Sequence, residues 1–179
     1  MTVVIFIVAI IFIIVLWYIL TLNKLNRAII KIDESSSGID VALTKRYDVL
    51  TKMIDVVKGY AKHEQETLFK VIELRSGMTV QEKNEVNKEM DENLSKINVL
   101  AESYPELKAS ENFKTLQQSI ADVEEHLQAA RRLYNSNVSM YNQSVVSFPT
   151  SIVAIINGFV KRDFFEAEET KKEDVKIDL

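Results

Sequence analysis

The two histidines could bind a metal or transfer a proton at neutral pH, but neither has the neighbours that such chemistry requires. His63-Glu64 starts like the zinc-protease motif His-Glu-x-x-His, in which two imidazoles one helical turn apart bind the ion. The fifth residue here is a threonine. A di-iron carboxylate bundle needs two Glu-x-x-His pairs, yet Tyr60 and Val123 stand three residues before His63 and His126. We therefore predict no metal site and no cofactor.

Other common catalytic arrangements also lack their residues. The chain contains no cysteine, which excludes disulfides, thiolate metal sites and thiol nucleophiles. It has no glycine-rich phosphate loop, and no Ser/His/Asp set can be argued from spacing. The carboxylates are numerous but resemble solvated helix faces. The formal charge of −4 gives no reason to expect nucleic acid as a partner. We predict that the protein is not an enzyme.

Three other positions combine polar chemistry with core spacing. Arg46 falls in an apolar seam, so its guanidinium either extends to the rim of the bundle or pairs with a carboxylate on a neighbouring helix, because an unpaired buried charge is very costly. Tyr134-Asn135 and Tyr141-Asn142 lie one heptad apart and share a helix face. They fit either hydrogen bonding inside the bundle or a surface for a partner.

The first element that must position these residues is an apolar run over residues 3–22, VVIFIVAIIFIIVLWYILTL. A helix of this length rises about 30 Å, the thickness of a hydrocarbon core. A signal peptide has a shorter apolar region, a basic start and a small-residue cleavage site, none of which is present. A buried core helix of this length would be unusual in so small a domain. We predict an uncleaved membrane anchor over residues 1–22.

The charges beside this run predict its orientation. Lys24, Arg27 and Lys31 follow it, and no ionisable side chain precedes it. Basic residues near a span tend to stay in the cytoplasm, so we expect the N-terminus outside and the helical domain in the cytoplasm. Trp17 and Tyr18 stand near the basic end, where amphipathic rings favour the membrane interface.

From residue 22 the apolar residues repeat every seven positions, which predicts that the membrane helix continues into the soluble domain. The two seams are Leu22, Ile29, Ser36, Leu43, Leu50 and Val57, and Leu25, Ile32, Ile39, Arg46, Met53 and Tyr60. Residues 35–38, Ser-Ser-Ser-Gly, are weak helix formers and a candidate soft point. The helix could end near 59–63 or near 76–79. We favour the first, with 76–79 as a kink, because it gives segments of matched length.

Two further amphipathic segments follow. The first opens with Thr79 and Glu82 at capping-box spacing and closes at Pro105. Its apolar residues are Val86, Met90, Leu94, Ile97, Leu100 and Tyr104. The second carries Phe113, Ile120, Leu127, Tyr134, Tyr141 and Phe148, with its seam drifting toward Val138 and Val145. Pro149 stops it. We expect a short last helix over residues 152–165.

Together these segments predict an all-α fold in which an N-terminal transmembrane helix continues into a long antiparallel bundle of three to four helices. The predicted domains are the anchor over residues 1–22, the helical bundle over residues 23–166 and a charged tail over residues 167–179. The tail has the composition of a disordered segment.

The sequence also resembles the LemA family over about residues 20–168. The motifs that carry the resemblance are Ile39-Asp40-Val41, Lys45-Arg46-Tyr47-Asp48, Val57-Lys58-Gly59-Tyr60-Ala61-Lys62-His63-Glu64, Thr67-Leu68, Leu94-Ser95, Ala101-Glu102-Ser103-Tyr104-Pro105-Glu106-Leu107-Lys108-Ala109, Asn112-Phe113, Leu116-Gln117, Ala130-Arg131-Arg132 with Tyr134-Asn135, Tyr141-Asn142 and Phe148-Pro149. Two places depart from the family pattern: Thr51-Lys52 replaces a common Pro-Asn, and Asn157-Gly158-Phe159 follows the usual ending only in part. The resemblance implies an anchored helical bundle of the bacterial plasma membrane without an assigned catalytic activity, and a magnetosome-associated branch that resembles an organelle-assembly factor.

These observations lead to the hypothesis of a membrane-anchored, non-enzymatic scaffold or interaction protein. The alternatives are a regulatory subunit of a membrane protease or signalling complex and, less favoured, a metal-dependent enzyme. We expect the lipid bilayer to bind residues 3–22, and expect protein partners, with a homo-oligomer as an option. The candidate structural or partner-contact residues are Arg46, Tyr47, Tyr60, His63, Glu64, Arg131, Arg132, Tyr134, Asn135, Tyr141, Asn142, Phe148 and Pro149.

Overall fold

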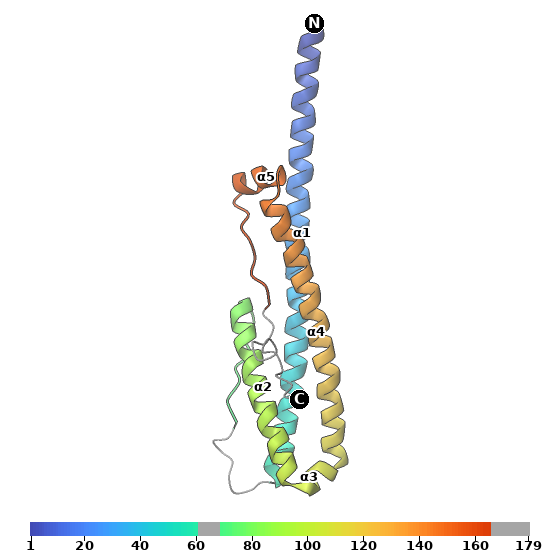
Figure 1. Ribbon diagram of the computed structural model, residues 1–179, viewed down its shortest axis with the longest axis vertical. Helices are drawn as coiled ribbons and strands as arrows, with labels where there is room; N and C mark the ends of the chain where they lie inside the picture. The colour runs from blue at the N-terminus through green and yellow to red at the C-terminus, as the bar shows by residue number, and fades with distance from the viewer. Residues whose placement is uncertain (61–68, 166–179) are drawn as a thin grey trace, which may run out of the picture. The chain divides into compact units, whose positions relative to one another are not determined.

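The computed structural model describes residues 1–60 and 69–165, and within them every regular element is a helix (Figure 1). The helices are α1 (Thr2–Tyr60), α2 (Val80–Ser103), α3 (Pro105–Ala109), α4 (Glu111–Val146) and α5 (Thr150–Ile156). The predicted all-α class is therefore confirmed. The chain divides into two compact units, each built from parts of α1 and α4. The predicted charged tail, residues 167–179, lies outside the described residues.

The first unit comprises Met1–Gly38 and Ala130–Asp163. Here α1 and α4 run antiparallel. The Asn137 side-chain amide donates to the Lys31 carbonyl and to the Ser35 hydroxyl, both at 3.2 Å, whereas Asn157, later in the chain, donates to the hydroxyl of the earlier Tyr18. The buried side chains between them come from the predicted seams and include Leu25, Ile32, Tyr134, Val138 and Tyr141. The drift of the α4 seam to Val138 is thus confirmed.

The start of α1 differs from the rest of the helix because its apolar side chains are exposed. From Val3 to Leu16 every residue is exposed, and Trp17 and Tyr18 are half-buried. The helix is long and apolar enough to cross a membrane, and no residue of its most apolar window is buried. Helical structure continues through residues 35–38, where the Ser35 and Ser37 hydroxyls donate to carbonyls of the preceding turn. The candidate soft point does not interrupt the helix.

The second unit comprises Ile39–Ala129 together with the chain from Phe164 onward. Its α1 and α2 segments run parallel, since Asp40 pairs with Lys83 and Arg46 contacts Asn87 and Asp91 further along both helices. The core of this unit joins four helices, α1 to α4, and the chain before α2. It consists of Leu50, Met53, Val57, Ile72, Val86, Met90, Ile97, Ala101, Leu107, Phe113 and Ile120.

The parallel arrangement is possible because residues 69–79 return as non-helical chain beside α2, as Figure 1 shows. Ser76 and Gly77 form a turn in which Gly77 has φ 79°, a value that favours glycine. The expected kink at 76–79 was therefore wrong, since this segment leads into α2 and does not bend a longer helix. The expectation of segments of matched length was also wrong, because α2 has 24 residues and α4 has 36.

The predicted helix boundaries hold where a capping residue or proline sets them. The Thr79 hydroxyl accepts from the Glu82 amide at 3.2 Å, and the Glu82 carboxylate accepts from the Thr79 amide at 2.7 Å, which completes the capping box. Pro105 ends α2 by starting α3, and Pro149 separates α4 from α5.

Three expectations near the ends of the helices were wrong. Tyr60 is exposed although it continues a seam of α1. Phe148 is 82% exposed because α4 ends two residues before it. The last helix spans Thr150–Ile156 and not 152–165, since Asn157 caps it and Gly158 follows with φ 69°.

Candidate functional site

The most buried charge in the described chain is Arg46, which lies at the centre of a cluster drawn from three helices. We call Arg46, Asn87, Asp91 and Glu124 the arginine cluster. Nη1 of Arg46 donates to the backbone carbonyl of Asn87 at 3.1 Å and to the side-chain Oδ1 of Asn87 at 2.7 Å. Nη2 pairs with the carboxylates of Asp91 on α2 and Glu124 on α4. Asn87 also donates to Asp91 Oδ2 at 3.1 Å, so the groups form one network.

This geometry decides between the two interpretations of Arg46. Its side chain is 2% exposed, so extension to the rim is excluded and pairing across helices is correct. A guanidinium does not lose its proton in proteins and so serves as neither general acid nor base. Both carboxylates are held by the same cation. The arrangement joins α1, α2 and α4, and it presents no reacting group.

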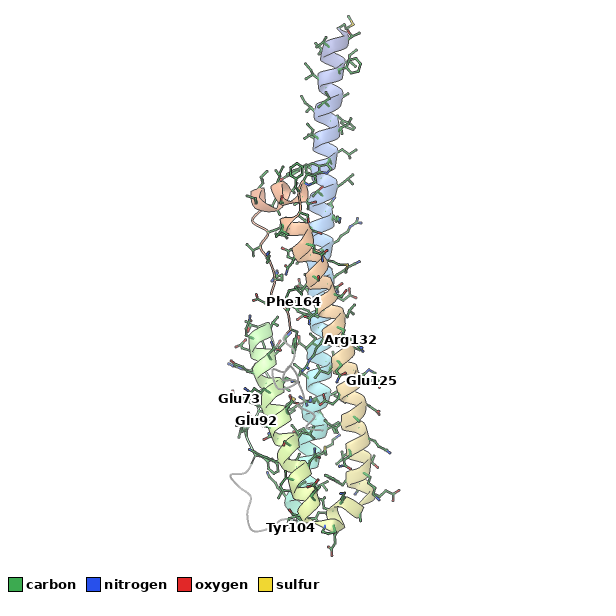
Figure 2. The ribbon with its side chains drawn as sticks, viewed as in Figure 1. Glu73, Glu92, Tyr104, Glu125, Arg132 and Phe164 are labelled. Atoms are coloured by element: carbon green, nitrogen blue, oxygen red, sulfur yellow. The ribbon has the colours of Figure 1, made fainter. Side chains whose placement is uncertain are left out.

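A second buried polar contact, which the sequence did not lead us to expect, attaches residues 69–79, the return segment, to α2. Asn93 is fully buried; its Oδ1 accepts from the Lys70 amide at 3.0 Å, and its Nδ2 donates to the Lys70 carbonyl at 2.9 Å. Next to this contact, Lys70 Nζ pairs at 2.6 Å with Glu92, which is labelled in Figure 2. That hydrogen bond raises the pKa of Lys70 and lowers the pKa of Glu92. Asn93 sits between Met90 and Ile97 at core spacing, which was the available signal.

The tyrosines and Asn142 of α4 form a third set, in the first unit. The Tyr134 hydroxyl donates to the Asp163 carbonyl at 3.1 Å, and the Tyr141 hydroxyl donates to the Val160 carbonyl at 2.9 Å. Asn142 donates to the Arg162 carbonyl and accepts from the Arg162 amide, both at 2.8 Å. These bonds hold residues 160–163 against α4. Hydrogen bonding inside the bundle is therefore the interpretation that the geometry fits for these three residues.

Both tyrosines have an altered acidity. Burial raises the pKa of Tyr134 and of Tyr141, and the nearby Arg162 opposes the shift in each case. A raised pKa keeps each hydroxyl protonated and able to donate to its carbonyl. The effect favours a structural hydrogen bond over an ionised catalytic group.

The remaining candidate residues do not gather at one site. Tyr47 is half-buried against the core of the second unit. Arg131 and Asn135 are half-buried, while Arg132, labelled in Figure 2, and Pro149 are exposed. His63 and Glu64 lie outside the described residues. Across residues 1–60 and 69–165, no group of three or more His, Cys, Asp or Glu side chains is placed to hold a metal ion.

Comparison with known proteins identifies similar sequences over most of the chain. The family model described as the LemA family matches residues 35–179. The protein named Protein LemA from Metamycoplasma hominis is 31% identical over 158 residues, which cover 86% of this chain and 72% of that protein.

Weaker likenesses connect the chain to magnetosome proteins. Magnetosome protein MamQ of Magnetospirillum gryphiswaldense is 25% identical over 72 residues, covering 40% of this chain. Magnetosome protein MamQ 2 of Paramagnetospirillum magneticum is 26% identical over 73 residues, covering 41%. The matches span only 26% and 27% of the lengths of these two proteins, so the likeness concerns a shared segment.

Proposed function

The chain belongs to the LemA family, and from that premise we propose that it is a membrane-anchored helical scaffold that acts by binding other proteins and catalyses no reaction itself. The observation that carries the proposal is the change of environment along α1. Its first turns expose apolar side chains on every face, whereas its later seams are buried in packed units. A helix apolar on all sides is stable where lipid surrounds it. Residues 3–22 would span the bilayer once.

The polar groups of the bundle support a binding role rather than catalysis. Arg46, Asn93 and the α4 tyrosines each make contacts that join parts of the same unit. Buried polar networks of this kind fix which helices pack together and in which register. The outer face of the bundle is then free to bind a protein partner or a second copy of the chain.

The charges beside the anchor support a cytoplasmic bundle. Lys24, Arg27 and Lys31 are all exposed, and each follows the apolar run within a few turns. Basic residues close to a span favour the cytoplasmic side. The N-terminus would therefore lie outside and the bundle inside.

Fractionation of the full-length protein tests the anchor. We expect it to sediment with membranes and to resist extraction by alkaline carbonate. A fragment that begins at Asn23 should instead be soluble, strongly helical by circular dichroism and cooperative in melting. Release of the full-length protein by carbonate would contradict the anchor, and a fragment without a melting transition would contradict the bundle.

Elemental analysis and crosslinking test the absence of catalysis and the binding role. The purified fragment should hold no stoichiometric zinc or iron. One metal per chain that His63→Ala or His126→Ala removes would overturn the non-enzymatic proposal.

Photocrosslinkers at exposed Val41 and Val99 in native membranes should capture the same protein repeatedly, or the chain itself. A probe buried at Leu127 serves as the matched control and should capture nothing.

A further inference from the structure

The last helix of the first unit leaves much of its apolar surface uncovered. In α5 the side chains of Val153 and Ala154 are fully buried, while Ile155 is 78% exposed and Ile156 and Ile152 are also exposed. Phe148 before the helix and Val160 after it are exposed apolar side chains as well. We call Phe148, Ile152, Ile155, Ile156 and Val160 the α5 patch. These side chains are exposed among the described residues, and exposed apolar side chains that gather in one place commonly mark a contact with a partner or a membrane.

The position of α5 along α1 shows which partner is available. The Asn157 side-chain amide donates to the Tyr18 hydroxyl at 2.9 Å, and the Tyr18 hydroxyl donates to Asn157 Oδ1 at 3.3 Å. Figure 1 shows α5 beside α1. Tyr18 stands near the basic end of the apolar run, where a tyrosine ring favours the membrane–water interface. The α5 patch therefore lies at the depth where the proposed span leaves the hydrocarbon.

The distribution of charge fits the same surface. No charged residue occurs between Arg132 and Lys161, so the end of α4 and the whole of α5 are uncharged. Positive charges border this region: Lys161 and Arg162 directly after the patch, and Lys24 and Arg27 on α1, all exposed. An apolar face bordered by basic residues complements acyl chains below anionic headgroups.

We propose that the α5 patch is a second membrane contact, which lies in the headgroup region of the same bilayer that α1 crosses. The inference rests on the proposed span, because Tyr18 sets the depth of α5 only if residues 3–22 are in lipid. The two contacts hold the first unit to the membrane at two points. The unit is then fixed in tilt and rotation, whereas a single helix leaves both free.

A lipid-quenching experiment on the full-length protein tests this contact. The chain has no cysteine, so a single introduced cysteine carries one environment-sensitive fluorophore. Ile155→Cys reports on the patch, Ile11→Cys on the span, and Val99→Cys, an exposed apolar position on α2, is the matched control. Each labelled protein is reconstituted in vesicles of phosphatidylcholine with phosphatidylglycerol that contain lipids brominated at shallow or deep acyl positions.

The expected result is strong quenching of the Ile155 label by shallow bromines, several-fold greater than that of the Val99 label. The Ile11 label should be quenched most by deep bromines. If Ile11 is quenched and Ile155 is not, the α5 contact is wrong while the anchor stands. If Ile11 is not quenched either, the proposed anchor itself fails. An Ile155 label that avoids the bromines but crosslinks to a second copy would assign the patch to self-association and overturn the proposal.

Discussion

The guanidinium of Arg46 lies between carboxylates from two other helices, and this makes its removal costly. Arg46→Met should lower the free energy of unfolding by about 3 kcal/mol, because the loss of one partner leaves buried charge uncompensated. The expected loss is at the lower end for such pairs, since the Asp91 and Glu124 side chains are 32% and 30% exposed. Urea unfolding of the fragment that begins at Asn23 measures it.

Two controls separate the pairing from simple loss of a long side chain. Arg132→Met, at an exposed position of α4, should leave the stability nearly unchanged. Replacing the whole set, Arg46→Met with Asp91→Leu and Glu124→Leu, should restore most of the lost stability, because the guanidinium and both of its carboxylate partners are then removed together. An Arg46→Met protein as stable as the parent would show that the arginine cluster contributes nothing.

The buried tyrosines of α4 predict a loss of stability in alkali. Burial raises the pKa of Tyr134 and Tyr141 in the folded state above the ordinary value of 10.0. The stabilisation is therefore complete below the ordinary pKa of the unfolded chain. It is lost as the pH rises from there through the raised pKa of the folded state, because the unfolded chain releases these protons first. Unfolding free energies between about pH 9 and about pH 11 should fall less steeply in the Tyr134→Phe, Tyr141→Phe protein. Equal slopes in the two proteins would contradict the raised pKa values.

Asn93 holds the return segment, residues 69–79, against α2 through two hydrogen bonds. Replacement by leucine keeps the volume but removes both hydrogen bonds to the Lys70 backbone. Hydrogen exchange at the Lys70 amide should accelerate strongly in Asn93→Leu, while the exposed Asn112→Leu serves as the unaffected control. Unchanged exchange at Lys70 would mean that other contacts hold residues 69–79.

At the scale of the helices, the seven-residue pattern of α4 makes a direct prediction about packing. Leu127 is fully buried, and Leu133 on the same helix is 57% exposed. Leu127→Ala should destabilise the protein by about 2–5 kcal/mol as a core truncation. Leu133→Ala should change stability by less than about 0.5 kcal/mol. Similar values for the two variants would show that the seam is misassigned.

The helices were predictable where periodicity and capping agree, as in α4, the capping box of α2 and the proline boundaries. The non-helical chain was not. Residues 69–79 and 157–165 have no regular apolar repeat, and their contacts depend on Asn93 and Tyr141 far away in sequence. The parallel direction of α2 follows from the first of these segments, so it could not be predicted either. Arg46 could be identified as unusual, but its two carboxylate partners depend on tertiary structure.

At the scale of the whole molecule, two long stretches of sequence without charged residues both belong to the first unit. Residues 2–23 carry no ionisable side chain except that of Tyr18, and no charged residue interrupts 133–160. The basic residues Lys24, Arg27, Lys161 and Arg162 follow these two stretches. In the proposed arrangement the start of α1 lies in lipid, and these basic residues lie on the aqueous side of the first unit. The orientation across the bilayer then decides which partners the bundle can meet.

The charges that set this orientation can be reversed, which gives the last prediction. Protease added to intact spheroplasts should leave the bundle uncut and should degrade it after lysis, because the positive charges of Lys24, Arg27 and Lys31 favour the cytoplasmic side for the proposed span. Changing all three to glutamate, with lysines added before Val3, should weaken or invert that protection. The three lie near the end of the span, where flanking charge has most influence. A matched protein with Lys45, Lys52 and Lys58 changed to glutamate loses the same charge further from the span and should keep its protection. Degradation of the unaltered bundle in intact spheroplasts would place it outside, so its partners would then be sought on the outer surface.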